Sequence, residues 1–301
     1  MGESLRALTH YVFAVCFALG ACGLVSCQSH ESHPVAGPFG VPRSSLEPAA
    51  PMRVVLYANT RFPSEPDLPA WESSLNIFEW LACEEWHVPS TNICRLQNQT
   101  SDAFLKWMET FRPSATSHEI LLLYFASHQL RDGTILFPRG PRLPGAQFVR
   151  MINRISGNRP LVLLNDSCFA EKIEWCGDFS SQVFRFHGCR VRERSSEVGL
   201  TNGSPAAMDL FRAERKLLEY QLGEAVDSAS FFSLLWLRAS REIIEENKDR
   251  VTLRMIGQRI ERARTQFAER VLRPHIAHPV VYPSDGDVEL FRIPASDGSG
   301  R

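Results

Sequence analysis

Two short runs of apolar residues constrain the fold of this 301-residue chain more than any other feature. One spans residues 120–125 and the other spans residues 160–164. Neither run alternates with polar residues, a pattern that is typical of parallel strands covered on both faces. Covering both faces of a sheet requires helices in the connections between strands. The runs therefore predict the interior of a mostly parallel α/β sheet.

The segments around these runs alternate in the same way between strand and helix patterns. Strands are expected at 53–58, 93–96 and 182–191, and helices at 71–86, 101–111 (with Ser101 as cap), 147–155, 229–246 and 253–272. This order predicts one α/β domain over residues 52–293, a sheet with helices on both faces. A disordered tail is expected at 294–301.

The N-terminus carries signals of export. An apolar run at 11–21 follows Arg6 and is too short to span a bilayer comfortably, which suits a signal peptide. Residues 24–27 resemble the lipobox of bacterial lipoproteins, with Cys27 as the lipidated residue and Cys22 as a second candidate. This predicts a signal peptide at 1–27, a flexible tether at 28–51 rich in Ser, Pro, His and Gly, and an exported, membrane-anchored cell-envelope lipoprotein. An uncleaved anchor and an ordinary secretory signal are the alternatives.

Reactive residues follow both buried strands. The first run is followed by His128 and the second by Cys168. The carboxyl ends of strands in open α/β sheets are where functional groups gather, so neighbouring strands would bring the two together. A thiol beside an imidazole can ionise and attack a carbonyl. The alternatives are a buried structural thiol and a histidine that serves only as a hydrogen-bonded polar group.

The two segments resemble the signature blocks of caspase-like cysteine peptidases, the group of caspases, metacaspases and legumains. Residues 124–128 (Tyr-Phe-Ala-Ser-His) with 132–138 resemble the metacaspase histidine block, and residues 161–168, ending Asp-Ser-Cys, resemble its cysteine block. Residues 186–189 and 195–197 are similar to a further stretch of the same family. The resemblance extends over nearly the whole of 53–293, and it implies a caspase-like three-layer sandwich.

The resemblance also implies an activity and its residues. A His128/Cys168 dyad would make the chain a cysteine endopeptidase acting on protein or peptide substrates, without a cofactor. In metacaspase-like members the acid two residues before the cysteine, here Asp166, lines the primary specificity pocket and accepts Arg or Lys. A carboxylate pairs well with a guanidinium. A second family acid is replaced here by Ser74, and Asp166 could instead cap the following helix.

Two departures from the family pattern bear on activity. Gln129 stands where a glycine usually follows the histidine, and its backbone N–H would share the oxyanion hole with that of Cys168. Its side chain is expected to crowd the substrate or to oppose the required backbone angle. The family's glycine shortly after the cysteine is also absent from 169–172. A catalytically inactive caspase-like binding module is therefore the alternative function.

The remaining cysteines, the metal-ligand spacing and the net charge bear on disulfide bonds, metal binding and nucleic-acid binding. An oxidising compartment favours the pairs Cys83–Cys94 and Cys176–Cys189, which would leave Cys168 as the odd thiol; five reduced cysteines are the alternative. No metal-ligand spacing is present. A net charge of −1 provides no footprint for nucleic acid. The basic stretch at 190–194 is expected to be a solvated loop or a self-cleavage site.

Overall fold

A six-stranded sheet lies at the centre of the domain. The computed structural model describes residues 47–48, 50–111, 119–190, 192–194, 197–199, 205–222, 225–246, 250–269, 280–282 and 287–292. The strand order is β10-β6-β5-β4-β2-β3, in which neighbours are parallel except for the antiparallel edge pair β10 and β6. The strands are β2 (Met52–Ala58), β3 (Ile93–Gln97), β4 (Ile120–Ala126), β5 (Leu161–Asn165), β6 (Val183–His187) and β10 (Val280–Tyr282). The predicted mostly parallel α/β sheet is confirmed.

Burial explains why the apolar runs form the centre of this sheet. All residues of β4 and of β5 are buried, whereas every residue of the edge strand β3 is half-buried. Successive side chains of a strand point to opposite faces. In β4, Leu122 packs into one core cluster and Leu123 into the other. A strand between two cores has no polar face, so its sequence shows no alternation.

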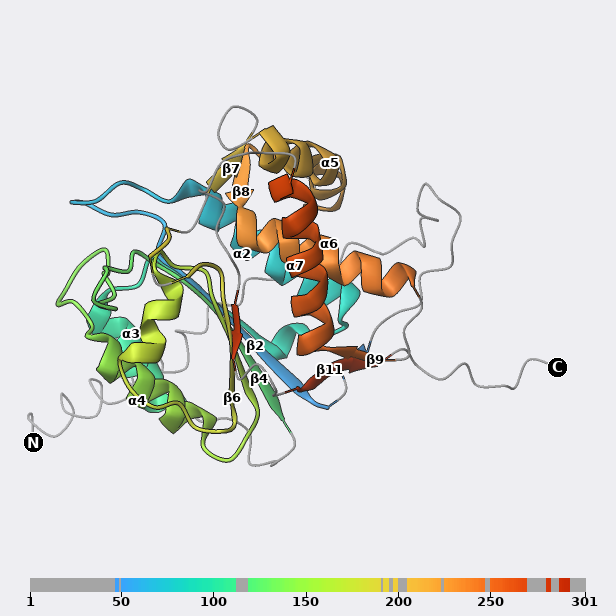
Figure 1. Cartoon of the computed structure of the whole chain (residues 1–301). Helices are drawn as coiled ribbons and strands as arrows, with labels where there is room; N and C mark the ends of the chain where they lie inside the picture. Colours follow the sequence, from blue (N-terminus) through green and yellow to red (C-terminus); the bar gives the residue numbers. More distant parts are fainter. Residues whose placement is uncertain are drawn as a thin grey trace, which may run out of the picture. The chain divides into compact units, whose positions relative to one another are not determined.

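Helices cover both faces, as predicted, and Figure 1 shows α3 and α4 on one side of the sheet and α2, α5, α6 and α7 on the other. The helical segments are α2 (Pro69–Trp80), the π-helical η1 (Leu81–Glu85), the short η2 (Ser90–Asn92), α3 (Ser101–Thr110), α4 (Gly145–Ser156), the 3₁₀ segment η3 (Ala170–Trp175), α5 (Pro205–Leu222), α6 (Phe231–Glu245) and α7 (Leu253–Glu269). The arrangement is a three-layer sandwich.

Several elements differ from the sequence predictions. The cap of α3 is Thr100, whose Oγ1 accepts a hydrogen bond from Ala103 N (3.2 Å), and not Ser101. Helix α5 was not predicted, and β6 ends at His187, short of the expected boundary. Two small sheets were also missed: β1 (Glu47–Pro48), β11 (Glu289–Arg292) and β9 (Arg250–Thr252) form one, and β7 (Glu197–Gly199) and β8 (Ser228–Ser230) the other. Because β1 pairs with β11, the predicted tether is too long at its C-terminal end.

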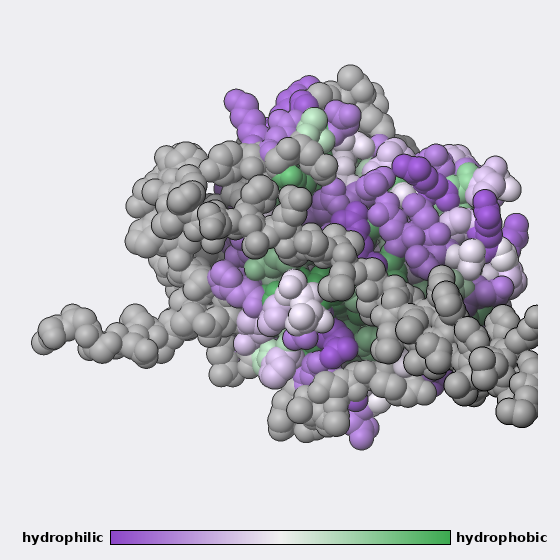
Figure 2. Space-filling model, turned by 180° about the vertical axis from the view of Figure 1, so that it is seen from behind, coloured by the Kyte–Doolittle hydropathy of each residue, from purple (hydrophilic) through white to green (hydrophobic). Residues whose placement is uncertain are grey.

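The N-terminal export signals lie outside the described residues, as do residues 28–46 and the tail at 294–301. None of the helices in the described part of the chain is long and apolar enough to cross a membrane. Figure 2 shows that the described surface seen from behind is mainly hydrophilic, with hydrophobic residues confined to small areas.

Removing a large core side chain tests this packing. Trp236 of α6 is fully buried and contacts the rings of Phe78, Phe186 and Phe232. Trp236→Ala is expected to lower the free energy of unfolding by about 3–5 kcal/mol, because it removes buried apolar surface and leaves a cavity. Trp175→Ala is the matched control, since Trp175 is 68% exposed and its loss should change stability little. Urea unfolding would measure the free energy of unfolding of both variants. Equal losses in the two would contradict the buried position of Trp236.

Candidate active site

The two strands that precede His128 and Cys168 are neighbours. Strands β4 and β5 pair in parallel with Phe125 opposite Asn165, so both chains leave the sheet at the same edge. Beyond the strands, Ser127 N donates to Ser167 Oγ (3.2 Å) and Asp166 N donates to Phe125 O (2.8 Å). The two segments are therefore hydrogen-bonded to each other as far as Ser127 and Ser167, the residues just before His128 and Cys168.

His128 is half-buried and is held by the loop between β2 and α2. Its Nε2 lies 2.8 Å from Pro66 O, and its ring packs on Phe62 with centroids 4.5 Å apart. A carbonyl oxygen can only accept a hydrogen bond, so Nε2 carries the proton and Nδ1 is left as an acceptor. A general base needs an acceptor nitrogen. The contact with Pro66 thus selects the tautomer that can take a proton from a thiol.

Cys168 lies in the tight turn between β5 and η3. The next residue, Phe169, adopts a left-handed backbone (φ 55°, ψ 31°), which is costly for a non-glycine side chain. Two hydrogen bonds hold it there: Phe169 N donates to Glu193 O (2.7 Å), and Phe169 O accepts from Gln129 Nε2 (3.0 Å). The turn is therefore fixed by the surrounding structure, although no glycine is present within it.

Gln129 does not crowd the site, contrary to the expectation from its sequence. Its side chain is buried beneath the turn, where Nε2 binds Phe169 O and Oε1 lies 3.5 Å from Asn165 Nδ2. Its φ is not positive, since the non-glycine residues with positive φ in the described chain are His87, Asn98 and Phe169. Gln129 therefore does not adopt a left-handed backbone in this structure.

The backbone N–H of Gln129 points out of the small hairpin that follows β4. Leu130 N donates to Thr134 O (2.8 Å) and Leu136 N donates to His128 O (2.9 Å), with Gln129 opposite Ile135. In antiparallel pairing, the residue between two such bonds directs its own N–H away from the partner strand. This donor is thus aimed away from the partner strand of the hairpin.

Asp166 is fully buried and does not act as a helix cap. Its Oδ2 accepts a hydrogen bond from Tyr124 Oη (2.9 Å), and its backbone oxygen accepts one from Trp71 Nε1 (2.8 Å). Burial raises the pKa of Tyr124 well above its ordinary value, and the Asp166 carboxylate raises it further. Tyr124 therefore stays protonated and remains a donor to this carboxylate.

A cluster of buried serines adjoins Tyr124 and Asp166. Ser74 Oγ donates to Ala70 O (2.9 Å), lies 2.9 Å from Ser233 Oγ and accepts from Ser230 N (3.1 Å). Both Ser74 and Ser230 act to lower the pKa of Tyr124, against the larger effects of burial and Asp166. Ser74 therefore belongs to the polar cluster around Tyr124, to which it adds a polar group without a charge.

The predicted disulfides are not formed among the five described cysteines. Cys94 packs on the α3 face of the sheet, whereas Cys83 belongs to η1, whose neighbours pack on the opposite face. The sulfur of Cys176 contacts Asp132 O (3.6 Å) and Lys172 O (3.5 Å). The sulfur of Cys189 lies elsewhere, 3.2 Å from Ser167 O and 3.4 Å from Ala170 N. Tertiary placement, not sequence proximity, decides which sulfurs can meet.

Cys189 and the basic stretch after it support the turn that contains Cys168. Burial raises the pKa of the Cys189 thiol well above its ordinary value, which disfavours the thiolate. Glu193, in the basic stretch, forms a turn with Arg190 and accepts the hydrogen bond from Phe169 N. At least this part of the stretch is bound to the domain rather than a fully solvated loop.

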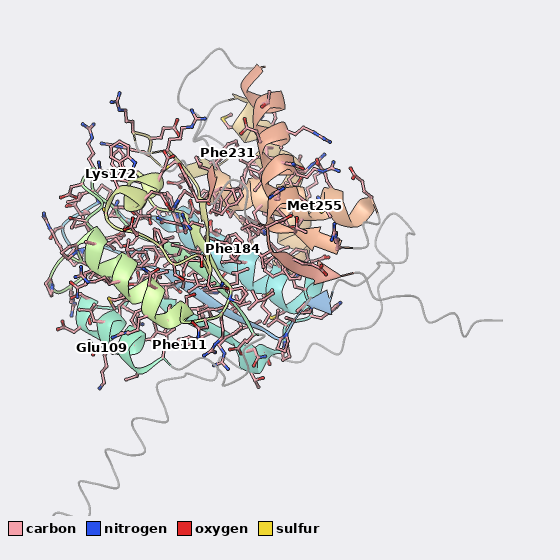
Figure 3. The ribbon with its side chains drawn as sticks, turned by 60° about the horizontal axis from the view of Figure 1, so that its bottom comes forward. Glu109, Phe111, Lys172, Phe184, Phe231 and Met255 are labelled. Carbon is pink, nitrogen blue, oxygen red and sulfur yellow. The ribbon has the colours of Figure 1, made fainter. Side chains whose placement is uncertain are left out.

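A charged cluster that sequence reasoning missed anchors η3 to β6. Glu174 binds Arg185 (2.9 Å) and the buried His187 Nε2 (2.6 Å). Burial acts to raise the pKa of Glu174, but the hydrogen bonds from His187 and Arg185 outweigh it and hold the pKa below its ordinary value. Figure 3 shows Lys172 of η3 well apart from Glu109 of α3 and from Phe111, which follows α3. Because η3 begins two residues after Cys168, the cluster braces the segment that follows Cys168.

This cluster predicts a pH dependence of stability. A carboxylate with a depressed folded-state pKa stabilises the fold above its unfolded pKa, and that contribution is lost as pH falls through the folded value. Glu174→Gln is therefore expected to cost about 3 kcal/mol at pH 7 and progressively less below pH 4.5. The control is Asp209→Asn, which breaks an exposed pair with Arg212 and should change stability little at any pH. Urea unfolding from pH 7 to pH 3 measures both, and a pH-independent cost for Glu174→Gln would contradict the assignment.

No protein-family model matches the chain, and neither does any curated protein. Within the described ranges, no group of three or more His, Cys, Asp or Glu could hold a metal ion. The geometry of the two strand ends is therefore the basis for a functional assignment.

Proposed function

We propose that the chain is a caspase-like cysteine endopeptidase that cleaves after Arg or Lys. The observation that carries the proposal is the position of His128. It follows the strand that pairs with the strand before Cys168, and its Nε2 is held by Pro66 O. The resemblance of both strand-end segments to the caspase-like blocks supports the same assignment, and the sheet with helices on both faces is compatible with it.

The chemistry follows from these positions. The Cys168 thiol passes its proton to His128 Nδ1, and the thiolate attacks the scissile carbonyl carbon to form a carbon–sulfur bond. The N–H groups of Gln129 and Cys168 would stabilise the oxyanion. The imidazolium then protonates the leaving amine as the carbon–nitrogen bond breaks. Water hydrolyses the thioester, and its proton returns through His128 to the sulfur.

Asp166 would supply the preference for basic residues. A buried carboxylate pairs strongly with a guanidinium or ammonium group that is desolvated beside it. Its Oδ1 lies next to Gly188 and Phe232, where a Cβ added at Gly188 would come within 3.2 Å of the carboxylate oxygen.

The second candidate is a catalytically inactive caspase-like binding module. The observation that favours it is the full burial of Asp166, which leaves no exposed carboxylate for a substrate in this state. In either case, we propose that lipidation at Cys27 or Cys22 anchors the protein to the membrane of the cell envelope.

A panel of fluorogenic peptides separates the two candidates. Peptides that differ only in the residue before the cut (Arg, Lys, Asp, Asn or Leu) would be incubated with the full chain across a range of pH. The endopeptidase predicts turnover of the Arg and Lys peptides alone. Equal cleavage after Asp or Asn would overturn the basic preference, and no cleavage of any peptide would favour the binding module.

A further inference from the structure

A cavity lies beside His128 at the same edge of the sheet. It is open to solvent, has a volume of about 450 Å³, and is lined by residues of the β2–α2 loop, the β3–α3 loop and the segment after the hairpin: Arg61, Phe62, Pro63, Asp67, Asn98, Thr100, Pro138 and Arg139. Its wall residue Phe62 is also the ring on which His128 packs. A volume of this size is typical of small-ligand sites.

Two guanidinium groups dominate the charge of this cavity. Arg61 and Arg139 are both exposed, and within the described residues neither side chain forms an ion pair or a hydrogen bond. The single lining carboxylate, Asp67, is engaged through Oδ1 by Phe62 N (2.8 Å). A smaller adjoining cavity shares Phe62 and Arg139 and adds both Arg142 and Glu65. Unpaired guanidinium groups bind carboxylates bidentately.

The walls of the cavity are held rigidly. Asn98 Oδ1 accepts hydrogen bonds from Thr60 N (2.8 Å) and Arg61 N (3.0 Å), which fixes the start of the β2–α2 loop. Ser101 N donates to Arg139 O (3.0 Å), which ties the opposite wall to α3. The backbone beneath both arginines is therefore preorganised, which reduces the entropic cost of binding.

The same loop serves the cavity and the candidate dyad. Arg61, Phe62 and Asp67 line the cavity, and Pro66 between them binds His128 Nε2. The cavity and the candidate dyad therefore share the β2–α2 loop.

We propose that this cavity is a substrate subsite that binds an acidic side chain, Glu or Asp, of the polypeptide that is cleaved. The inference rests on the proposed endopeptidase function, because it assigns the cavity to the same substrate. The ligand is a side-chain carboxylate held by Arg61 and Arg139, at a fixed position away from the Arg or Lys before the cut.

Peptides that differ by one charge test the subsite. A set with Arg before the cut would carry Glu at one flanking position at a time, on either side, and a matched set would carry Gln. At one position, Glu is expected to raise kcat/KM about tenfold over Gln, mainly through KM, and added salt should reduce this ratio. In the double variant Arg61→Gln/Arg139→Gln, the ratio of kcat/KM for the Glu peptide to that for the Gln peptide should fall to about one. In Arg139→Glu, a peptide with Lys at that flanking position should be preferred over the Glu peptide. Arg150→Gln, an exposed arginine of α4, should retain the wild-type ratio.

Binding to an inactive variant separates the subsite from turnover. Fluorescein-labelled versions of the Glu and Gln peptides would be titrated into the Cys168→Ala protein and followed by anisotropy. Tighter binding of the Glu peptide, lost in the Arg61→Gln/Arg139→Gln background, supports the subsite even if the wild type cleaves nothing; the proposed catalysis alone would then fail. Equal binding of Glu and Gln peptides at every position, or no binding of either, would overturn the subsite.

Discussion

Replacing His128 by asparagine is expected to lower kcat for Arg and Lys peptides by about 10³- to 10⁴-fold. The imidazole both removes the thiol proton and returns it to the leaving amine, and general acid–base groups contribute on this order. Asparagine is shorter than histidine and does not replace the contact of Nε2 with Pro66 O, so urea unfolding of His128→Asn should first establish that the protein remains folded. Steady-state kinetics under saturating peptide would measure the loss.

The matched control for this prediction is His87→Asn. His87 is an exposed histidine with a positive φ of 50°, a conformation that asparagine tolerates. Its replacement should leave kcat unchanged. If His128→Asn retained kcat within tenfold of the wild type, His128 could not be the general base, whatever the identity of the nucleophile.

Replacing Asp166 by asparagine is expected to lower kcat/KM for Arg and Lys peptides by about 10²-fold and to remove the preference over neutral residues. The substitution deletes the buried charge that would pair with the basic side chain, a loss of the order measured for buried charge pairs. Asparagine keeps an oxygen for the Tyr124 hydroxyl, so the protein should remain folded.

A second aspartate provides the control for this loss of specificity. Asp178 is exposed, and Asp178→Asn should change neither kcat/KM nor the preference. Urea unfolding of Asp166→Asn would establish that any loss is not a loss of fold. An unchanged preference for Arg in a folded Asp166→Asn protein would show that Asp166 does not determine specificity.

The centre of the fold could be predicted from sequence because its signals are local and strong. The apolar runs of β4 and β5 do not alternate with polar residues, a pattern that is typical of a strand covered on both faces. The parallel order then placed His128 and Cys168 at one edge. Helix α5 was missed because charged residues interrupt its apolar positions, and β7 and β8 have too few residues to show a period.

The contacts that define the site depend on residues far apart in the chain. The partner of His128 is a backbone oxygen at Pro66, to which no side-chain pattern points. The inward direction of Gln129 depends on Phe169 O, and the serines beside Tyr124 come from α2, β8 and α6. The disulfide predictions failed for the same reason, since the faces on which Cys83 and Cys94 lie are set by tertiary packing.

Covalent labelling of Cys168 tests the central claim most directly. The full chain would be incubated with an Arg-chloromethylketone probe, and the alkylated cysteines would be identified by mass mapping. Burial raises the pKa values of Cys176 and Cys189, so neither should react readily as a thiolate. We expect labelling at Cys168, its loss in His128→Asn and its retention in His87→Asn. An unlabelled Cys168 in the wild type, or labelling that does not depend on His128, would contradict the proposed dyad.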